Sequence, residues 1–208
     1  QMLYWTIKFP KNFFDLNIFQ LFLNTLYLVS FTSLILLVFS FLSNYGNRVT
    51  RSKILSSLST FSITGYAIPG VILAVAFITF IAWFDENIIK LLDIKSIKKF
   101  FIGSIFGLVI VYFIRFYSLA FNGVKTGYQR INRSIDESSY LLGYSKLRTF
   151  LGIHIPYLKN SIFLIGILIT IEVIKELPIT LILRPFNFET FATTAYVFAS
   201  QDLLEAAA

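Results

Sequence analysis

The chain has 208 residues, of which 56% are hydrophobic and only 14% are charged, and its mean hydropathy is +0.74. This composition excludes an ordinary water-soluble surface. The chain has no cysteine and one histidine, which excludes a disulfide scaffold and thiolate-ligated metal chemistry. The formal net charge of +7 fits either nucleic-acid binding or a membrane topology, and the positions of the basic residues decide between them.

Long stretches of the chain carry no charge. Residues 16–47, 54–84 and 160–171 contain no Asp, Glu, Lys or Arg, and Arg115 is the only charged residue in 100–124. A helix needs about 20 apolar residues to cross a bilayer. We therefore expect four membrane-spanning helices, near residues 19–43, 64–84, 101–121 and 158–177.

The connecting segments differ in charge. Residues 44–60 are basic without an acid, and 122–156 carry five basic residues against two acids, whereas 85–99 and 178–208 are mixed or acidic. The positive-inside rule places 44–60 and 122–156 in the cytoplasm and both chain ends outside. Topology thus explains the basic charge, and we expect no nucleic-acid partner. Because the last segment ends without a basic stop, we also expect further spans beyond both ends.

The segment 122–156 is long for a connection, and its residues predict an ordered structure. Ser134 and Glu137 have the spacing of a capping box, in which each side chain accepts from the other residue's backbone N–H. Acidic groups here also complement the positive end of the helix dipole. We expect a short helix over residues 135–142.

A turn and a second helix should follow. Gly143 can adopt the left-handed conformation of a helix end, Ser145 can cap a helix towards residue 153, and Pro156 precedes the next span. The resulting hairpin has apolar side chains that suit a protein partner, although an amphipathic helix on lipid headgroups would use the same residues. The physics of the segment leaves these two alternatives open.

One motif favours the protein partner. Glu137-Ser138-Ser139, three residues, Gly143, nine residues and Ile153-His154-Ile155-Pro156 resemble the EAA motif, E-A-A-x3-G-x9-I-x-L-P, of ABC importer permeases. The chain departs from it by serine for both alanines, a small-for-small change, and by Ile155 for leucine, an apolar-for-apolar change. His154 falls at a variable position, so we expect a structural or exposed histidine and not a ligand.

In that family the motif forms the coupling helix that docks into a cytoplasmic ATPase. The resemblance implies a set of ATPase-coupling residues in this chain. They are Glu137, Ser138, Ser139, Tyr140, Leu141, Gly143, Ile153, Ile155 and Pro156.

Further stretches resemble permeases of ferric iron importers, most closely their second half. These stretches are residues 65–70, 120–122, 175–178 and 183–188, together with Arg115 and the closing Ala199-Ser200. The similarity covers essentially the whole chain. It implies a second permease half, fused in the same chain or separate, and a periplasmic or surface-bound solute-binding protein.

Helix-breaking residues occur at two spans. Gly65, Pro69 and Gly70 open the second span, and Pro178 interrupts the end of the fourth. Membranes tolerate broken helices where neighbours or a cavity satisfy the freed backbone groups, and such helices often line a path. The alternative is a packing kink, with small residues at a helix contact.

Three ionisable residues lie in the fourth span. Glu172, Lys175 and Glu176 are spaced i, i+3 and i+4, so they share one helix face and can pair. Carboxylates there could attract a small cationic substrate at an outer gate. An ion cluster that only fixes helix packing would have the same spacing, so both readings stay open.

We therefore expect an all-α polytopic helical bundle, the transmembrane domain of a type I ABC importer with a cytoplasmic coupling helix, spanning residues 1–208. It would sit in a bacterial cytoplasmic (inner) membrane and pass ferric iron inward by alternating access. The chain has no P-loop, so it would not be an enzyme and would hold no cofactor, while a separate ATPase dimer binds ATP and Mg. Alternatives are the same importer with thiamine, a phosphonate, a polyamine or sulfate as cargo, or an ion-coupled secondary transporter.

Overall fold

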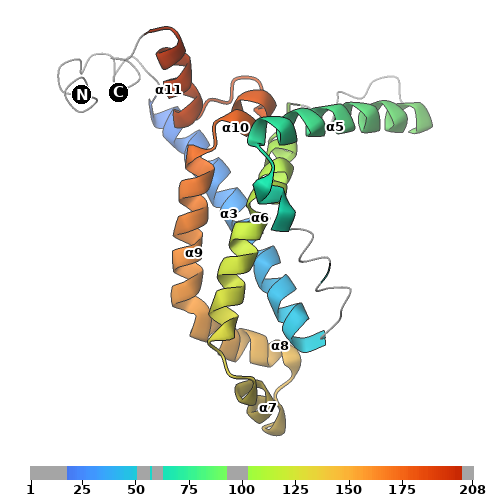
Figure 1. The fold of residues 1–208 in the computed structure, drawn as a ribbon, viewed down its shortest axis with the longest axis vertical. Coiled ribbons are helices and arrows are strands. Elements are labelled where there is room, and N and C mark those ends of the chain that lie inside the picture. The colour runs from blue at the N-terminus through green and yellow to red at the C-terminus, as the bar shows by residue number, and fades with distance from the viewer. Residues whose placement is uncertain (1–17, 51–56, 58–62, 93–102, 203–208) are drawn as a thin grey trace, which may run out of the picture. The chain divides into compact units, whose positions relative to one another are not determined.

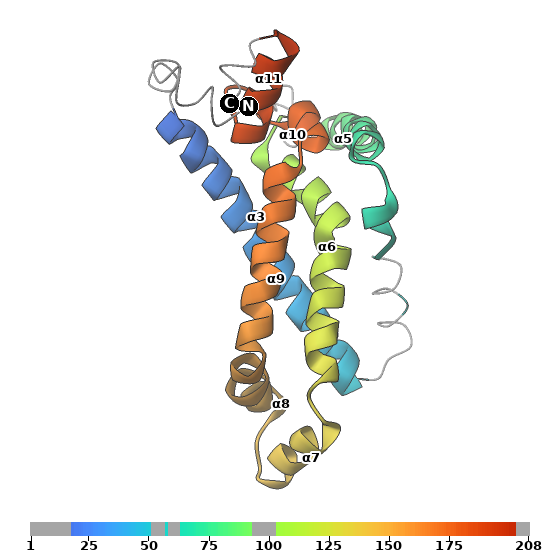
Figure 2. The same cartoon turned by 60° about the vertical axis from the view of Figure 1, so that its left-hand side comes forward.

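The computed structural model describes residues 18–50, 57, 63–92 and 103–202 (Figures 1 and 2). Within these residues every regular element is a helix, as the composition predicts. In chain order the elements are α3 (Ile18–Thr50), η1 (Ile63–Ala67), α5 (Gly70–Leu92), α6 (Ile105–Gln129), α7 (Arg133–Leu141), α8 (Lys146–Thr149), η2 (Phe150–His154), α9 (Ile155–Lys175), α10 (Pro178–Leu183) and α11 (Phe191–Ser200).

Four of the described helical runs are long and apolar enough to cross a membrane, which indicates a membrane protein. They are Ile18–Thr50, Gly70–Asn87, Ile105–Gln129 and Lys146–Lys175. All four expected spans are therefore present as helices. Arg51 and Lys53, which contribute to the predicted orientation, lie outside the described residues, as do Lys95, Lys98 and Lys99.

The helix boundaries differ from those expected. The second long helix begins only at Gly70, because a 3₁₀ turn and Pro69 precede it. The third continues to Gln129, beyond residue 121 where we placed the end of the span, so the first part of segment 122–156 is helical. A helix satisfies its own backbone hydrogen bonds, so it can continue past the apolar core into water.

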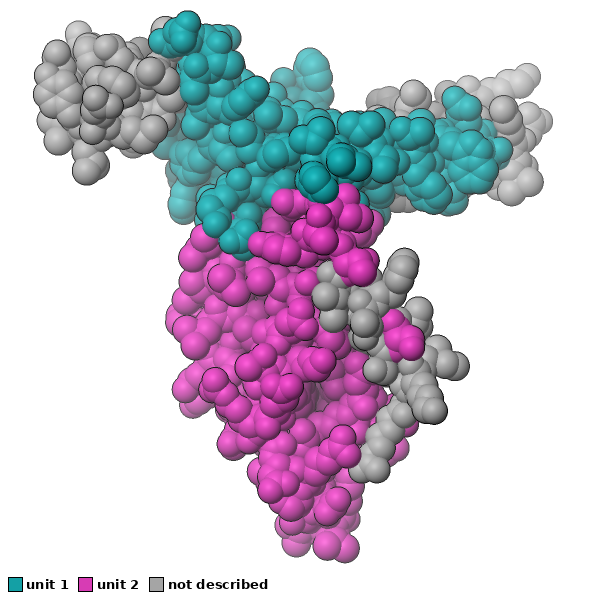
Figure 3. Space-filling view, viewed as in Figure 1, with its two compact units in different colours: residues 1–32, 69–112, 172–208 teal, residues 33–68, 113–171 magenta. Residues whose placement is uncertain are grey.

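The described chain forms two compact units (Figure 3), residues 33–68 with 113–171 and the remaining residues. In the first of these, α6 approaches α9 closely at Gly123 and Gly127. A Cβ at Gly123 would lie 2.8 Å from the Ile165 side chain, and one at Gly127 would lie 3.1 Å from Leu158. Glycines four residues apart thus let side chains of α9 pack directly against the backbone of α6.

Polar side chains join α3 to α6 in the same unit. The buried Asn44 donates to the Phe121 carbonyl at 3.1 Å, and the Tyr117 hydroxyl lies 2.7 Å from Ser43 Oγ. Such bonds between helices replace hydrogen bonds that water would otherwise supply. They fix the C-terminal half of α3 against α6, which is the support for the hairpin described below.

The other unit contains α5, α10 and α11. The short helix α10 packs against α5, and α11 begins with a capping box formed by Thr190 and Thr193. The Phe191 N–H donates to Thr25 Oγ1 at 3.2 Å, and Asn24 donates to the Glu189 carbonyl at 3.0 Å. These bonds tie α11 and the segment before it to the first turns of α3.

Candidate functional site

A two-helix hairpin, α7 and α8, follows the end of α6 and leads into α9 (Figure 2). Its first helix begins earlier than expected. Asn132 is the N-cap, and its side chain accepts from the Ser134 N–H at 3.3 Å. Ser134 is already the second residue of the helix, so the predicted capping box of Ser134 and Glu137 is wrong; asparagine is an equally good cap, and it precedes the serine.

The turn of the hairpin agrees with its sequence. Gly143 has φ +80°, its N–H donates to the Tyr140 carbonyl at 3.0 Å, and the Tyr144 N–H donates to the Ser139 carbonyl at 3.0 Å. This pair of bonds is a Schellman motif. Ser145 then caps α8 by accepting from the Arg148 N–H. Gly143 at the end of the first helix and Ser145 as the cap of the second are therefore confirmed.

The predicted coupling residues fall on two faces of α7. Ser139 is 3% exposed, and its hydroxyl donates to the Asp136 carbonyl and lies 2.8 Å from Thr149 Oγ1. Leu141 and Leu142 are 89% and 77% exposed. Ser139 therefore fastens α7 to α8, whereas the leucines present apolar surface outward. The remaining members Glu137, Ser138 and Tyr140 are exposed, as is Pro156, while Ile153 and Ile155 are half-buried.

The buried face of α7 holds an ionic cluster that the sequence did not reveal. One oxygen of the Asp136 carboxylate accepts from Arg48 Nε at 2.6 Å, and the other lies 2.8 Å from His154 Nε2. His154 is fully buried. Of the two alternatives expected for it, a structural histidine is therefore confirmed and an exposed histidine is wrong. The partners of His154 in the cluster are Arg48 on α3 and Asp136 on α7, and no residue spacing in the sequence predicts these contacts. The one sequence feature that points to the cluster is an acidic residue, Asp136, directly before the glutamate of the EAA-like motif.

The environment of Asp136 favours its ionised form. Burial alone would raise the pKa of this carboxyl, but hydrogen bonds from Arg48 and His154 and the Arg48 charge outweigh burial and hold the pKa below its ordinary value. The carboxylate accepts two hydrogen bonds, so His154 Nε2 carries the proton in their contact. Edge-on contacts from the Tyr45 and Tyr128 rings enclose the imidazole.

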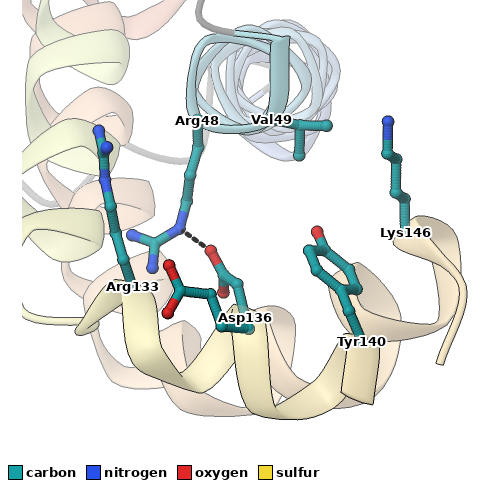
Figure 4. A pocket seen from close by; sticks show the side chains of 7 residues that line it. Arg48, Val49, Arg133, Asp136, Tyr140 and Lys146 are labelled. Carbon is teal, nitrogen blue, oxygen red and sulfur yellow. Dashed lines mark hydrogen bonds and ion pairs between the residues drawn. The ribbon is translucent and has the colours of Figure 1, made fainter. Parts of the chain in front are cut away.

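Two hollows flank α7. One of about 220 Å³ lies between α7 and the end of α3 (Figure 4), with the basic side chains of Arg133 and Lys146 beside it. The other, of about 510 Å³, lies on the opposite side, where Leu142 and Ile153 contribute apolar walls. The hairpin therefore has a hollow on each side of α7.

The hairpin joins α9 through a π turn, η2. The Ile155 N–H donates to the Phe150 carbonyl five residues before it, so the helix is locally wider. Pro156 follows at once and lacks an N–H, and in an α-helix its ring would meet the carbonyl of Gly152. The wider turn relieves that contact, and it also carries His154. We expected Pro156 to close a loop before the span, but it lies inside a continuous helical run.

The glycine and proline residues assigned to a path do break the second span. Gly65 lies in η1, where a Cβ would come within 2.1 Å of the Ile114 carbonyl oxygen, and Arg115 donates to the Ile68 carbonyl at 2.7 Å. Pro69 and Gly70 then separate η1 from α5. At Gly65 the close backbone contact favours the packing role over a path.

The break at the end of the fourth span is also observed. α9 ends at Lys175, and Pro178 is the first residue of α10. Lys175 pairs with Glu172 at 2.9 Å and is largely exposed, whereas Glu176 is 8% exposed. The backbone carbonyl of Glu176 accepts from Thr180 Oγ1 at 2.5 Å, which satisfies a group freed by the break.

Nothing among the described residues resembles a metal centre: no group of three or more metal-ligating side chains occurs there. No protein-family model matches the chain, and no curated protein matches it either. The hairpin α7–α8 and the broken end of the fourth span are therefore the two candidate sites, and their geometry carries the functional argument.

Proposed function

We propose that this chain is the transmembrane permease subunit of an ATP-driven type I ABC importer in a bacterial inner membrane. The observation that supports this most is the hairpin α7–α8. Gly143, at the glycine position of the EAA-like motif, ends α7 in the left-handed conformation, and Glu137, Leu141 and Leu142 are exposed beside it. A partner protein can therefore bind these residues while the hairpin stays folded.

In this proposal the chain itself hydrolyses nothing. A cytoplasmic ATPase dimer binds ATP and Mg, and its closure displaces α7 and α8. The hairpin is continuous with α9 through η2 and follows α6 directly, so its displacement reaches two spans. A second permease half would complete the pathway, and the spans would alternate between access from the two sides of the bilayer.

The cargo we propose is ferric iron released from a solute-binding protein. The carboxylates of Glu172 and Glu176 support a cationic cargo, since they stand at the broken end of the fourth span. The Lys175 ammonium beside Glu172 would keep such a site from holding the ion tightly. A conduit of this kind needs no resident metal.

The test of the ATPase role is Glu137→Lys in the assembled importer. We expect ATP-driven uptake to fall at least tenfold, roughly, because the reversed charge faces the partner surface. Glu86→Lys, which makes the same charge change at an exposed position of α5, is the matched control. An ion-driven carrier would transport normally with Glu137→Lys, and that outcome would reject the proposal in favour of a secondary transporter that uses Glu172 and Glu176.

The cargo is tested separately. Uptake of radioactive ferric iron is measured in a strain lacking this chain and in the same strain with the gene restored. Unchanged iron uptake would remove the iron assignment and leave the importer with another cargo, such as thiamine, a phosphonate, a polyamine or sulfate.

A further inference from the structure

The attachment of α7 to the rest of its unit is concentrated in one carboxylate. Asp136 is 9% exposed, and its two oxygens contact side chains from two different elements, Arg48 of α3 and His154 of η2. Each contact is short, at 2.6 and 2.8 Å, and His154 is fully buried. Asp136 therefore bridges the end of one span and the beginning of another.

Arg48 extends the same connection to the end of α6. Its terminal nitrogens donate to the carbonyls of Tyr128, Ile131 and Asn132, at distances of 3.1 to 3.3 Å. These carbonyls belong to the last turn of α6 and to the segment that leads into α7. The planar guanidinium can hold several acceptors and a carboxylate at once, which a lysine ammonium cannot do with the same geometry.

The neighbour of Asp136 faces the other way. Glu137 is exposed on α7, and the leucines after it are exposed as well. A force applied to this outer surface is therefore transmitted through a helix whose inner face is held by charge-assisted hydrogen bonds. Such bonds are stronger and more directional than neutral ones, so they resist a change in helix position.

We propose that Arg48, Asp136 and His154 are positioning residues that fasten α7 to α3, to the end of α6 and to the π turn before α9. A displacement of α7 then moves these segments together instead of being absorbed in the hairpin. This inference rests on the proposed function, because it concerns how the ATPase-driven displacement is used. It adds three residues that are not among the predicted ATPase-coupling residues, and two of them, Arg48 and His154, lie on elements other than α7.

A purely structural role is the competing explanation, since removing one partner of a buried ion pair leaves an uncompensated charge and destabilises a protein. The two roles differ in what they change. Loss of stability alone lowers the amount of folded importer, and with it ATP hydrolysis and transport in equal proportion. Loss of positioning lowers the cargo moved per ATP hydrolysed by the folded complex.

The experiment uses the complete importer, with its ATPase and solute-binding protein, reconstituted in proteoliposomes. Asp136→Asn keeps the shape of the side chain but cannot accept from both Arg48 and His154, because one of its terminal atoms is now a donor. The matched control is Asp202→Asn, at an exposed position with φ 59° that asparagine tolerates. Iron delivered by the binding protein and phosphate released are measured on the same vesicles.

We expect Asp136→Asn to hydrolyse ATP while moving about tenfold less iron per ATP, and Asp202→Asn to match the wild type. A cargo-to-ATP ratio for Asp136→Asn within about twofold of the wild-type value would overturn the proposal. If Asp136→Asn does not accumulate in the membrane, Arg48→Lys decides. Arg48→Lys keeps a positive charge beside Asp136 but loses the planar guanidinium that donates to the backbone carbonyls. The cargo-to-ATP ratio should therefore still fall, and a wild-type ratio would contradict the proposed role of the three residues.

A double variant tests whether the residues act as a unit. Arg48→Gln with Asp136→Asn leaves neither charge unpaired, and it should lower the cargo-to-ATP ratio no further than Asp136→Asn alone. Losses that multiply would show independent roles and overturn the proposal. Failure of the proposed function looks different, because wild-type vesicles would then show no ATP-driven uptake at all.

Discussion

At the scale of single residues, Asp136 combines burial with charge in a way that its neighbours in sequence do not. Arg48 and His154 hold its carboxyl pKa below the ordinary value, so the folded state binds fewer protons there than the unfolded chain at mildly acidic pH. The stabilisation this provides is complete above the unfolded pKa, near 3.8, and is lost as the pH falls through the lower folded value.

This gives a prediction for acid stability. The melting temperature of the purified wild type should exceed that of Asp136→Asn at neutral pH, and the difference should shrink as the pH is lowered through about 4, where the unfolded carboxyl titrates. Thermal unfolding in detergent from pH 7 to pH 3 measures it. Asp202→Asn should follow the wild type throughout. A difference between wild type and Asp136→Asn that stays constant across this range would contradict the assigned pKa direction.

Gly143 offers a second residue-scale prediction, with a control in the same hairpin. Its φ of +80° is unfavourable for alanine although a Cβ there would meet no atom within 4 Å. We expect Gly143→Ala to lower the free energy of unfolding by about 1 kcal/mol or more, from backbone conformation alone. Gly152 also has open space around it but lies in the helical run, so Gly152→Ala should be neutral or stabilising by up to about 1 kcal/mol.

Denaturant unfolding of the two alanine variants beside the wild type decides this prediction. Equal losses at Gly143 and Gly152 would mean that the hairpin turn is not held in the left-handed conformation. A variant Gly143→Asn should lose less than Gly143→Ala, because asparagine visits that region of the Ramachandran map more readily.

At the scale of elements, the sequence predicts local features better than long-range ones. Gly143 and Ser145 mark their turn and cap because each acts on backbone groups within a few residues. The predicted N-cap of α7 is wrong because Asn132 and Ser134 are both favourable N-cap residues. Only the direction of the chain as it leaves α6 selects Asn132. The contact between Asp136 and His154 depends on a π turn, and no residue pattern encodes that turn except the proline after it.

The 3₁₀ turn η1 gives a prediction at this scale. A Cβ at Gly65 would overlap the Ile114 carbonyl oxygen, which belongs to the backbone and cannot rotate away. We expect Gly65→Ala to destabilise the protein by about 1–3 kcal/mol through forced separation of η1 from α6. Gly166→Ala is the control, since its Cβ would make an ordinary 3.6 Å contact with Leu37. Thermal unfolding that shows equal stability for the two variants would contradict the close packing at Gly65.

At the scale of the whole molecule, the charge pattern predicts the four described helices that are long and apolar enough to cross a membrane, because a bilayer imposes length and hydrophobicity on every crossing segment. It does not predict where these helices end. α6 runs to Gln129 through Lys125, and the last run begins at Lys146, since a helix does not have to stop where the lipid stops. The charge pattern does not reveal a cargo, an ATPase partner or a second permease half, so these belong to the proposal alone.

Topology is the last prediction, and the absence of cysteine makes it directly testable. Leu147 on the hairpin is 66% exposed and Phe186, after α10, is 95% exposed, so single cysteines there should react with a membrane-impermeant maleimide. By the positive-inside rule Leu147→Cys should be labelled only in inverted vesicles and Phe186→Cys only in intact spheroplasts. Adding the ATPase subunit to the inverted vesicles should protect Leu147→Cys, whereas labelling of Leu147→Cys from outside would remove both the orientation and the coupling role of α7 and α8.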